Sequence, residues 1–251
     1  MTDLHCHILP GLDDGAADPA TSCRMAEMAF AGGTRRIVCT PHCSTDDDAL
    51  TQRSREILLI TDLLQKALRQ KGIGLELRPA MELLCTERLE EALRRQLLLP
   101  LDGNRYLLME FYFDTSAAFI NDCVRCAQSY GYTPVLAHPE RYEALQRDPR
   151  PLAVWAQDCV IQVNKGSILG RFGPQAGETA AWLLRHELAG VVASDAHSDK
   201  QRTPDLTPAV RFVAERYSQE YAARLFFRNP RRIAEGKPLS PPKNRPRKDM
   251  P

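Results

Sequence analysis

The chain has 251 residues, of which 43% are hydrophobic, and its formal net charge is +1. This length suits either one α/β barrel or two smaller domains, and no run reaches the roughly 20 apolar residues of a membrane-spanning helix. The near-neutral charge gives no electrostatic reason to expect nucleic acid or a membrane as a partner.

Seven short apolar runs predict β-strands, and the longer stretches between them show helical periodicity. The predicted strands cover residues 3–7, 36–40, 74–81, 106–111, 134–137, 160–163 and 190–193. The predicted helices cover residues 20–31, 48–71, 86–97, 116–130, 151–158, 175–186 and 207–225.

This alternation of strand and helix is typical of parallel βα units. We expect an α/β fold, a distorted (β/α)7 TIM-like barrel in one domain over residues 1–237. An open doubly wound sheet is the alternative, but it would spread the strand ends along a line, whereas a barrel gathers them at one mouth. Residues 238–251 are rich in Pro, Lys and Arg and predict a disordered basic tail.

The first residues and the cysteines bear on the compartment. Residues 1–9 lack a basic n-region, so we expect no signal peptide and a cytoplasmic protein. The eight cysteines are then expected to be reduced, mostly as small core residues. Cys123 and Cys126 have redox or zinc spacing, but they lie in a helical pattern without a second pair. Their role is left open, as are the role of the basic tail and the oligomeric state.

Residues that bind metal ions gather where predicted strands end. Five of the six histidines lie there, and only His186 does not. In a strand, residues two apart point to the same side, so His5 and His7 can hold one ion together. Histidine with carboxylate suits Mn, Fe or Zn. The predicted ligands are His5, His7, Asp14, His42, Glu82, Glu110, His138, Asp195 and His197.

Three ions are one way to divide this set, with Glu82 as a bridge because it lies on a middle strand. The three groups would be His5, His7, Glu82 and Asp195; Glu82, Glu110 and His138; and Asp14, His42 and His197.

Such a cluster favours hydrolysis of phosphate esters. Bound ions lower the pKa of water from about 15.7 toward about 7 and clamp both the attacking and the leaving oxygen. Arg141, three residues after His138, and Arg202, five after His197, are the candidates to hold the phosphoryl group. The fork of an arginine matches two phosphate oxygens.

The motifs resemble those of the bacterial capsule-type tyrosine phosphatases of the polymerase-and-histidinol-phosphatase superfamily. The resemblance extends from residue 3 to residue 233. Its motifs are Asp3-Leu4-His5-Cys6-His7-Ile8-Leu9-Pro10-Gly11-Leu12-Asp13-Asp14-Gly15, Thr40-Pro41-His42, His138-Pro139-Glu140-Arg141-Tyr142, Ser194-Asp195-Ala196-His197 and Asn229-Pro230-Arg231-Arg232-Ile233.

The resemblance implies a distorted seven-stranded barrel with a trinuclear site, often manganese-dependent. It implies removal of phosphate from tyrosines of a bacterial kinase that controls exopolysaccharide export, so the expected partner is a phosphotyrosine protein. The family's ligands match the nine residues above, and its phosphate-binding arginine matches Arg141. Lys165, at the end of a strand without a predicted ligand, is a departure that would place a bulky charge near the mouth.

Two other functions remain open. A small phosphoester such as histidinol phosphate would use the same metals, and a deep closed pocket would favour it. A non-catalytic metal-binding scaffold is the third possibility. Catalysis by cysteine is disfavoured, because none of the eight cysteines has an arginine six positions later.

Overall fold

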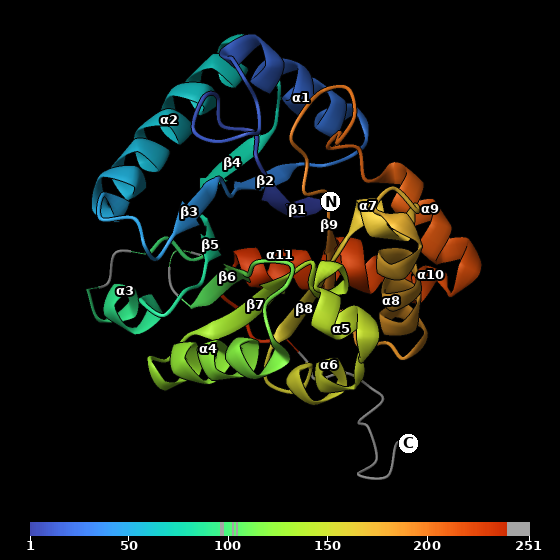
Figure 1. Ribbon diagram of the computed structural model, residues 1–251. Coiled ribbons are helices and arrows are strands. Elements are labelled where there is room, and N and C mark those ends of the chain that lie inside the picture. Colours follow the sequence, from blue (N-terminus) through green and yellow to red (C-terminus); the bar gives the residue numbers. More distant parts are fainter. Residues whose placement is uncertain (96–97, 102, 104, 240–251) are drawn as a thin grey trace.

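The computed structural model describes residues 1–95, 98–101, 103 and 105–239. Helices surround the strands, with α2 and α1 on one side and α8, α9 and α10 on another (Figure 1). The strands are β1 (Thr2–Cys6), β2 (Arg36–Cys39), β3 (His42–Ser44), β4 (Glu76–Pro79), β5 (Glu82–Leu84), β6 (Tyr106–Glu110), β7 (Thr133–Ala137), β8 (Val160–Asn164) and β9 (Val191–Ala193). The helices are α1 (Pro19–Ala31), α2 (Leu50–Gln70), α3 (Leu89–Arg95), α4 (Ala117–Ser129), the 3₁₀ turn η1 (Pro139–Arg141), α5 (Glu143–Arg147), α6 (Arg150–Trp155), α7 (Lys165–Ile168), α8 (Gly173–Arg185), α9 (Thr207–Arg216), α10 (Gln219–Ala223), the π turn η2 (Arg224–Arg228) and α11 (Asn229–Ala234).

Every strand pair in the described residues is parallel, as the alternation of strands and helices predicted. The strands form two sheets, with orders β1-β2-β4 and β3-β5-β6-β7-β8-β9. The α/β class is therefore confirmed, but the expected closed ring of seven strands is not what the pairing shows.

The difference arises directly after two of the predicted strands. The predicted strand 36–40 is β2, which ends at Cys39, and an additional strand, β3, begins at His42 after Thr40 and Pro41. Proline has no N–H to give to a ladder. The predicted strand 74–81 is β4, which ends at Pro79, and an additional strand, β5, begins at Glu82 after Ala80 and Met81. Residues after each break start the second sheet.

The first and last strands meet through one short contact. Cys6 and Ala196 form an isolated parallel bridge. The N–H of His7 donates to the Ala196 carbonyl at 2.8 Å, and the N–H of Asp195 donates to the His5 carbonyl at 2.8 Å. This contact brings the carboxyl ends of β1 and β9 together, although it does not extend into a ladder.

Alternation along β6 separates the core from the polar end of the strand. Leu107 and Met109 pack in the large apolar cluster with the helices. Tyr106 and Leu108 belong to a smaller cluster between the strands. Glu110 continues the second set, because side chains two apart share a face. The strand thus carries a carboxylate at the end of an otherwise apolar face.

Helix boundaries follow local capping and burial. Asp18 caps α1 by accepting from the N–H of Thr21 at 2.7 Å, with Pro19 in the first turn. The predicted helix 207–225 is divided, because Ser218 caps a new helix by accepting from the N–H of Tyr221 at 3.0 Å. None of the helices in the described residues has the length and apolar character needed to cross a membrane.

The last helix closes the end of the molecule where the strands begin. Ile233 of α11 is fully buried in the cluster between the strands. Asn229 donates to the Gly190 carbonyl at 2.8 Å, and the Tyr106 hydroxyl donates to the Lys237 carbonyl at 2.8 Å. Of the predicted tail, residues 240–251 lie outside the described residues, while Leu239 packs against this cluster.

Candidate metal centre

The nine predicted ligands converge at the carboxyl ends of the strands. His5 lies in β1 and Glu110 ends β6, while His42 and Glu82 begin the short strands β3 and β5. Four sets of side chains have ligand atoms within 4.8 Å of one another. These sets are His7, Asp14, His42 and His197; His5, Glu82 and His138; His5, His7 and Asp195; and His42, Glu82 and Glu110.

Two of these residues have left-handed backbone conformations. His138, directly after β7, has φ +33°, and Asp195, two residues after the end of β9, has φ +48°. Non-glycine residues rarely adopt this region, and such strain concentrates at functional sites. The turn of the backbone at each position occurs where the strand ends and the side chain joins the cluster.

Glu82 lies at the centre of the cluster and is fully buried. Its Oε2 is 3.1 Å from His5 Nε2 and 3.2 Å from His7 Nε2. The same oxygen is 3.1 Å from His42 Nδ1, while Oε1 is 3.0 Å from His138 Nε2. One carboxylate therefore touches four imidazoles, which is the position that a bridging ligand needs.

The spacing of these atoms fits ions. Ligands about 2.1 Å from a shared ion lie roughly 3.0 Å apart in octahedral and roughly 3.4 Å apart in tetrahedral geometry. His5 Nε2 and His7 Nε2 face each other at 3.1 Å, and each lies 3.5 Å from Asp195 Oδ1. Buried Glu82 Oε2 and His197 Nε2 make no hydrogen bond within the described residues. The spacing of these donor atoms therefore fits the coordination of cations.

The solvent side of the cluster is formed by Asp14, His42 and His197. Asp14 Oδ1 lies 3.5 Å from His42 Nε2 and 3.4 Å from His197 Nε2. The Asp14 side chain is 67% exposed and that of His42 is 38% exposed. His42 also places Nδ1 3.1 Å from Glu110 Oε2. It thus belongs to two groups, whereas the predicted partition placed His138, not His42, with Glu82 and Glu110.

Two residues that the sequence analysis did not single out orient the ligand histidines. His7 Nδ1 lies 2.7 Å from Asp13 Oδ2, which also accepts from the N–H of His42 at 2.9 Å. His5 Nδ1 lies 2.8 Å from Gln162 Oε1. Both partners are acceptors, so Nδ1 carries the proton and Nε2 is left for an ion. The position of Asp13 beside Asp14 in the opening motif is the sequence feature that could have pointed to its role.

In the protein without ions, the carboxylates and imidazoles of the cluster stabilise each other's charged forms. Burial alone would raise the pKa of Glu82, but the charge of His5 and the hydrogen bond from His138 hold it well below its ordinary value. Burial alone would lower the pKa of His42, but Glu110 and Glu82 raise it to about 10. Protons on imidazole therefore neutralise the carboxylates in the positions where cations would do so.

Both predicted arginines reach the cluster. Arg141, in the turn η1, places Nη1 3.6 Å from Asp195 Oδ2. Arg202 places Nη2 2.5 Å from the same oxygen. Their side chains are 18% and 30% exposed. Two guanidinium groups thus stand at the edge of the ligand set.

Lys165 has a different position from the one expected. The side chain is buried, and its ammonium donates to the carbonyls of Thr203 and Asp205 instead of entering the mouth. Tyr142 is likewise buried, with its hydroxyl donating to the Ala137 carbonyl at 2.8 Å. Both residues support the loops around the site.

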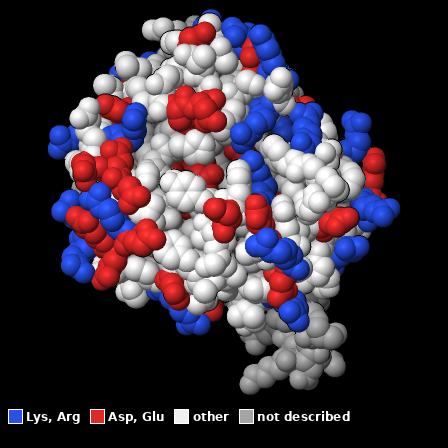
Figure 2. All heavy atoms as spheres, in the orientation of Figure 1, with Lys and Arg blue, Asp and Glu red and all other residues white. Residues whose placement is uncertain are grey.

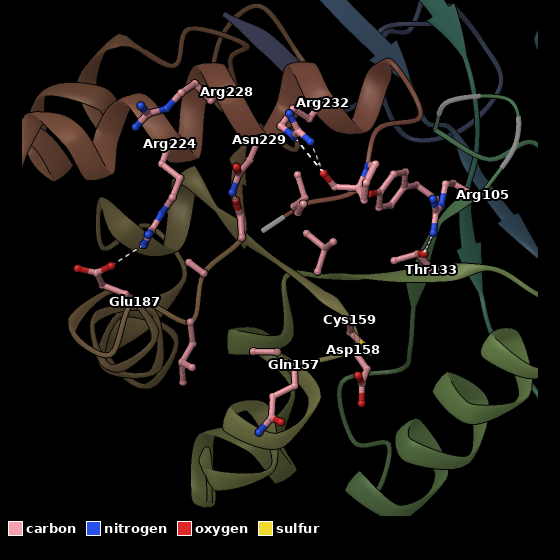
Figure 3. A pocket seen from close by; sticks show the side chains of 18 of the residues that line it. Arg105, Thr133, Gln157, Asp158, Cys159, Glu187, Arg224, Arg228, Asn229 and Arg232 are labelled. Carbon is pink, nitrogen blue, oxygen red and sulfur yellow. Dashed lines mark hydrogen bonds and ion pairs between the residues drawn. The ribbon is translucent and has the colours of Figure 1, made fainter. Parts of the chain in front are cut away.

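A cavity of about 500 Å³ lies far from these ligands, at the end where the strands begin. Figure 3 shows its arginines engaged by neighbours, with Arg224 paired to Glu187 at 2.7 Å and Arg232 donating to the Pro238 carbonyl. None of the predicted ligands lines it. The candidate site is therefore the cluster at the carboxyl ends of the strands.

Parallel strands whose ends and following loops bring together nine histidines and carboxylates define an α/β protein with a candidate polynuclear metal centre. The sequence profile described as "Capsular polysaccharide synthesis, CpsB/CapC" matches residues 1–235. The chain belongs to this family.

Individual relatives align with this chain over most of their length. The tyrosine-protein phosphatase YwqE of Bacillus subtilis is 34% identical over 221 residues, which are 88% of this chain and 86% of the relative. The tyrosine-protein phosphatase CpsB of Streptococcus pneumoniae is 28% identical, over 93% of this chain and 98% of the relative. A solved structure from work on these two proteins, described there as unique metal-dependent tyrosine phosphatases, has a TM-score of 0.88 and 32% identity. The structural match covers 99% of this chain and 100% of the chain in that structure.

Proposed function

We propose that this protein is a metal-dependent tyrosine phosphatase that acts on a phosphotyrosine protein of capsule or exopolysaccharide synthesis. The observation that carries the proposal is the convergence of nine ligand-type side chains with two arginines at one end of the strands. The relatives named as tyrosine-protein phosphatases support the reaction. A bacterial tyrosine kinase tail is the proposed substrate, and the short bridge between β1 and β9 supports treating residues 1–237 as one distorted barrel.

The residues divide the chemistry among them. The nine ligands would hold three ions, with manganese proposed and iron or zinc as alternatives, since imidazole and carboxylate serve all three. Bound ions supply an acidified water and neutralise charge on the phosphoryl oxygens. Arg141 and Arg202 bind and orient the phosphoryl group through their in-plane N–H donors. Asp13 and Gln162 keep the proton of His7 and His5 on Nδ1.

An open site favours a protein substrate over a small one. Tyr112 and Phe113, which follow β6, are 60% and 45% exposed, and Asp14 is 67% exposed. Acidic and basic side chains are interspersed on the face shown in Figure 2. A phosphotyrosine on an extended peptide would meet exposed aromatic and charged side chains at such a surface.

The test compares phosphate release from a phosphotyrosine peptide and from histidinol phosphate, with added manganese and with a chelator. We expect manganese-dependent release from the peptide and its loss with the chelator. His42→Ala should lower the rate by at least about 100-fold, because His42 belongs to two ligand groups. The matched control is His186→Ala, since His186 caps the end of α8 and donates to the Trp182 carbonyl.

The other outcomes decide between the alternatives. A preference for histidinol phosphate would assign the same site to a small phosphoester. No turnover of either substrate by protein that binds manganese would favour a scaffold. If iron or zinc restored more activity than manganese, the proposed metal would change and the proposed reaction would stay the same.

A further inference from the structure

β8 carries no predicted ligand, yet the segment that follows it contacts both arginines. This segment, residues 165–172, joins β8 to α8. The ring centroid of Phe172 lies 4.4 Å from Arg141 Cζ and 5.6 Å from Arg202 Cζ. Phe113, from the loop after β6, places its ring 4.5 Å from Arg141 Cζ. Two aromatic rings thus contact one guanidinium, and one ring contacts both.

These contacts restrain the arginines without using their hydrogen-bond donors. An aromatic ring attracts a guanidinium through its face and leaves the in-plane N–H groups directed outward. Arg141 and Arg202 both extend an Nη atom toward Asp195 Oδ2. The stacked groups are therefore held with their donors toward the candidate metal centre, where a phosphoryl group would bind.

A glycine makes room for the Phe172 ring. A Cβ added to Gly166 would lie 2.3 Å from Cε2 of Phe172 and 2.8 Å from Cζ. Gly166 lies in α7, and its φ is not in the left-handed region, so backbone conformation does not require glycine here. Its N–H donates to Asn164 Oδ1 at 2.8 Å, and the amide of Asn164 donates to Asp195. The place of this glycine is explained by the ring that packs on it.

Other side chains of the segment hold the loop that carries Arg202. Lys165 donates to the carbonyls of Thr203 and Asp205, and Arg171 donates to the Gln201 carbonyl at 2.5 Å. These carbonyls lie on both sides of Arg202. The buried charge of Lys165, which departs from the family pattern, therefore has a structural task at this loop.

We propose that residues 165–172 form a positioning element for the phosphate-binding arginines, with Phe172 as the residue that orients Arg141 and Arg202 together. This inference rests on the proposed function, because it assigns the arginines to a phosphoryl group. Phe172 acts through the arginines and has no direct contact with the reacting atoms. Loss of its ring should weaken phosphate binding while the metals remain bound.

The first experiment measures binding of inorganic phosphate to the manganese-loaded protein by calorimetry. Phe172→Leu removes the aromatic face with little loss of volume, and we expect affinity to fall about 3- to 30-fold, the range of one cation–π contact. Manganese content should stay unchanged. Phe172→Tyr, which keeps the face, should restore affinity, and Phe212→Leu on the exposed side of α9 is the matched control.

A double-mutant cycle separates positioning from a general loss of structure. In the Arg141→Gln, Arg202→Gln background, Phe172→Leu should have no further effect on residual phosphate binding. Gly166→Ala should reproduce the loss seen with Phe172→Leu by displacing the ring. Gly177→Ala, where the added Cβ would meet only the Ser167 carbonyl at 3.7 Å, should leave binding unchanged.

The outcomes distinguish this inference from the proposed function. Equal phosphate affinity in the wild type, Phe172→Leu and Gly166→Ala would overturn the positioning role alone. If phosphate affinity depends on Phe172 but the wild-type protein releases no phosphate from a phosphotyrosine peptide, the tyrosine phosphatase would be overturned and the positioning role upheld. Wild-type protein that loads manganese but does not bind phosphate would overturn both.

Discussion

A histidine that binds an ion through Nε2 needs an acceptor for the proton on Nδ1. In this protein Asp13 serves His7 and Gln162 serves His5. Burial alone would raise the pKa of Asp13, but its hydrogen bond with His7 and the N–H of His42 lower it to about 2. Asp13 is therefore an anion throughout the neutral range and fixes the orientation of two neighbouring ligands.

Replacing this carboxylate should weaken metal binding more than it weakens the fold. We expect Asp13→Asn to lower manganese affinity by about 10- to 100-fold, the usual cost of losing such a hydrogen-bond partner. Competition with a chelator of known affinity would measure it. Asp62→Asn, which removes only an exposed ion pair with Lys66 on α2, is the control. Equal affinities for the two variants would show that Asp13 does not orient the ligands.

The pH dependence of stability should differ between metal-free and metal-loaded protein. The pKa of His42 is raised from 6.5 to about 10, so its contribution to metal-free stability is complete below pH 6.5 and is lost as the pH rises through about 10. An ion in place of the proton removes this dependence. We expect the difference in Tm between manganese-loaded and chelator-treated protein to widen from pH 6.5 to about 10.

His197 does not disturb this window, because burial lowers its pKa from 6.5 to about 3 and its titration falls below pH 6.5. A Tm difference that stays constant or narrows across the range would contradict the assignment of His42. His42→Gln should reduce the widening, and the remainder is expected from His7 and His138, whose pKa values are also raised, by Asp13 and Glu82 respectively, against the effect of burial.

The convergence of the nine candidate ligands was predictable and that of their supporting residues was not, for a physical reason. A ligand is recognised by its type and its place at a strand end, both local properties of the sequence. His5 and Gln162 are 157 positions apart, and their contact exists only once the fold brings β1 and β8, which are not paired strands, close together. Phe172 was missed for the same reason, because its partners come from two other loops.

At the scale of elements, the strand positions were largely correct and their continuity was not. Apolar runs identified the segments that became β1, β6, β7, β8 and β9 within one or two residues. The short strands β3 and β5, which follow Pro41 and Met81, were not predicted, because each has only three residues and begins with a polar side chain. Whether a barrel closes depends on hydrogen-bonded pairing between strands, and neither composition nor hydrophobic periodicity reveals that pairing.

Asn229 at the start of α11 ties this helix to the strand end at Gly190, away from the metal centre. We expect Asn229→Ala to lower the free energy of unfolding by about 1 kcal/mol, the net value of one hydrogen bond, with kcat/KM unchanged. Denaturant unfolding measures the first quantity and phosphate release the second.

Arg231→Ala is the control on the same helix. It removes only an ion pair with Glu235 from a side chain that is 73% exposed, so a change below about 0.5 kcal/mol is expected. A fall in kcat/KM in Asn229→Ala would mean that the two ends of the molecule are coupled.

At the scale of the whole molecule, the burial of the cysteine thiols indicates how well the core excludes solvent. All eight cysteines are free, and seven of them are buried. Burial raises the pKa of the thiols of Cys43 and Cys123 to about 12, which suppresses the reactive thiolate. Cys126, on α4, is only partly buried. The Cys123 and Cys126 pair thus spans the boundary between the core and the surface.

A thiol-reactive dye should therefore label one cysteine quickly in the folded protein and all eight after denaturation. Mass spectrometry of the partly labelled protein should identify Cys126, and Cys126→Ser should remove the fast phase. Fast labelling of Cys6 or Cys43 in the metal-loaded protein would show that the core beside the site opens more readily than the packing implies.

The bridge between Cys6 and Ala196 has a consequence for the order of assembly. The candidate metal centre draws on residues from His5 to His197, and both ends of that interval meet at this bridge. During synthesis the residues of two of the four sets, His5, Glu82 and His138 and His42, Glu82 and Glu110, leave the ribosome before Asp195 and His197 do. The other two sets can form only when the segment after β9 joins β1. Completion of the candidate centre is therefore a late event in the life of each molecule.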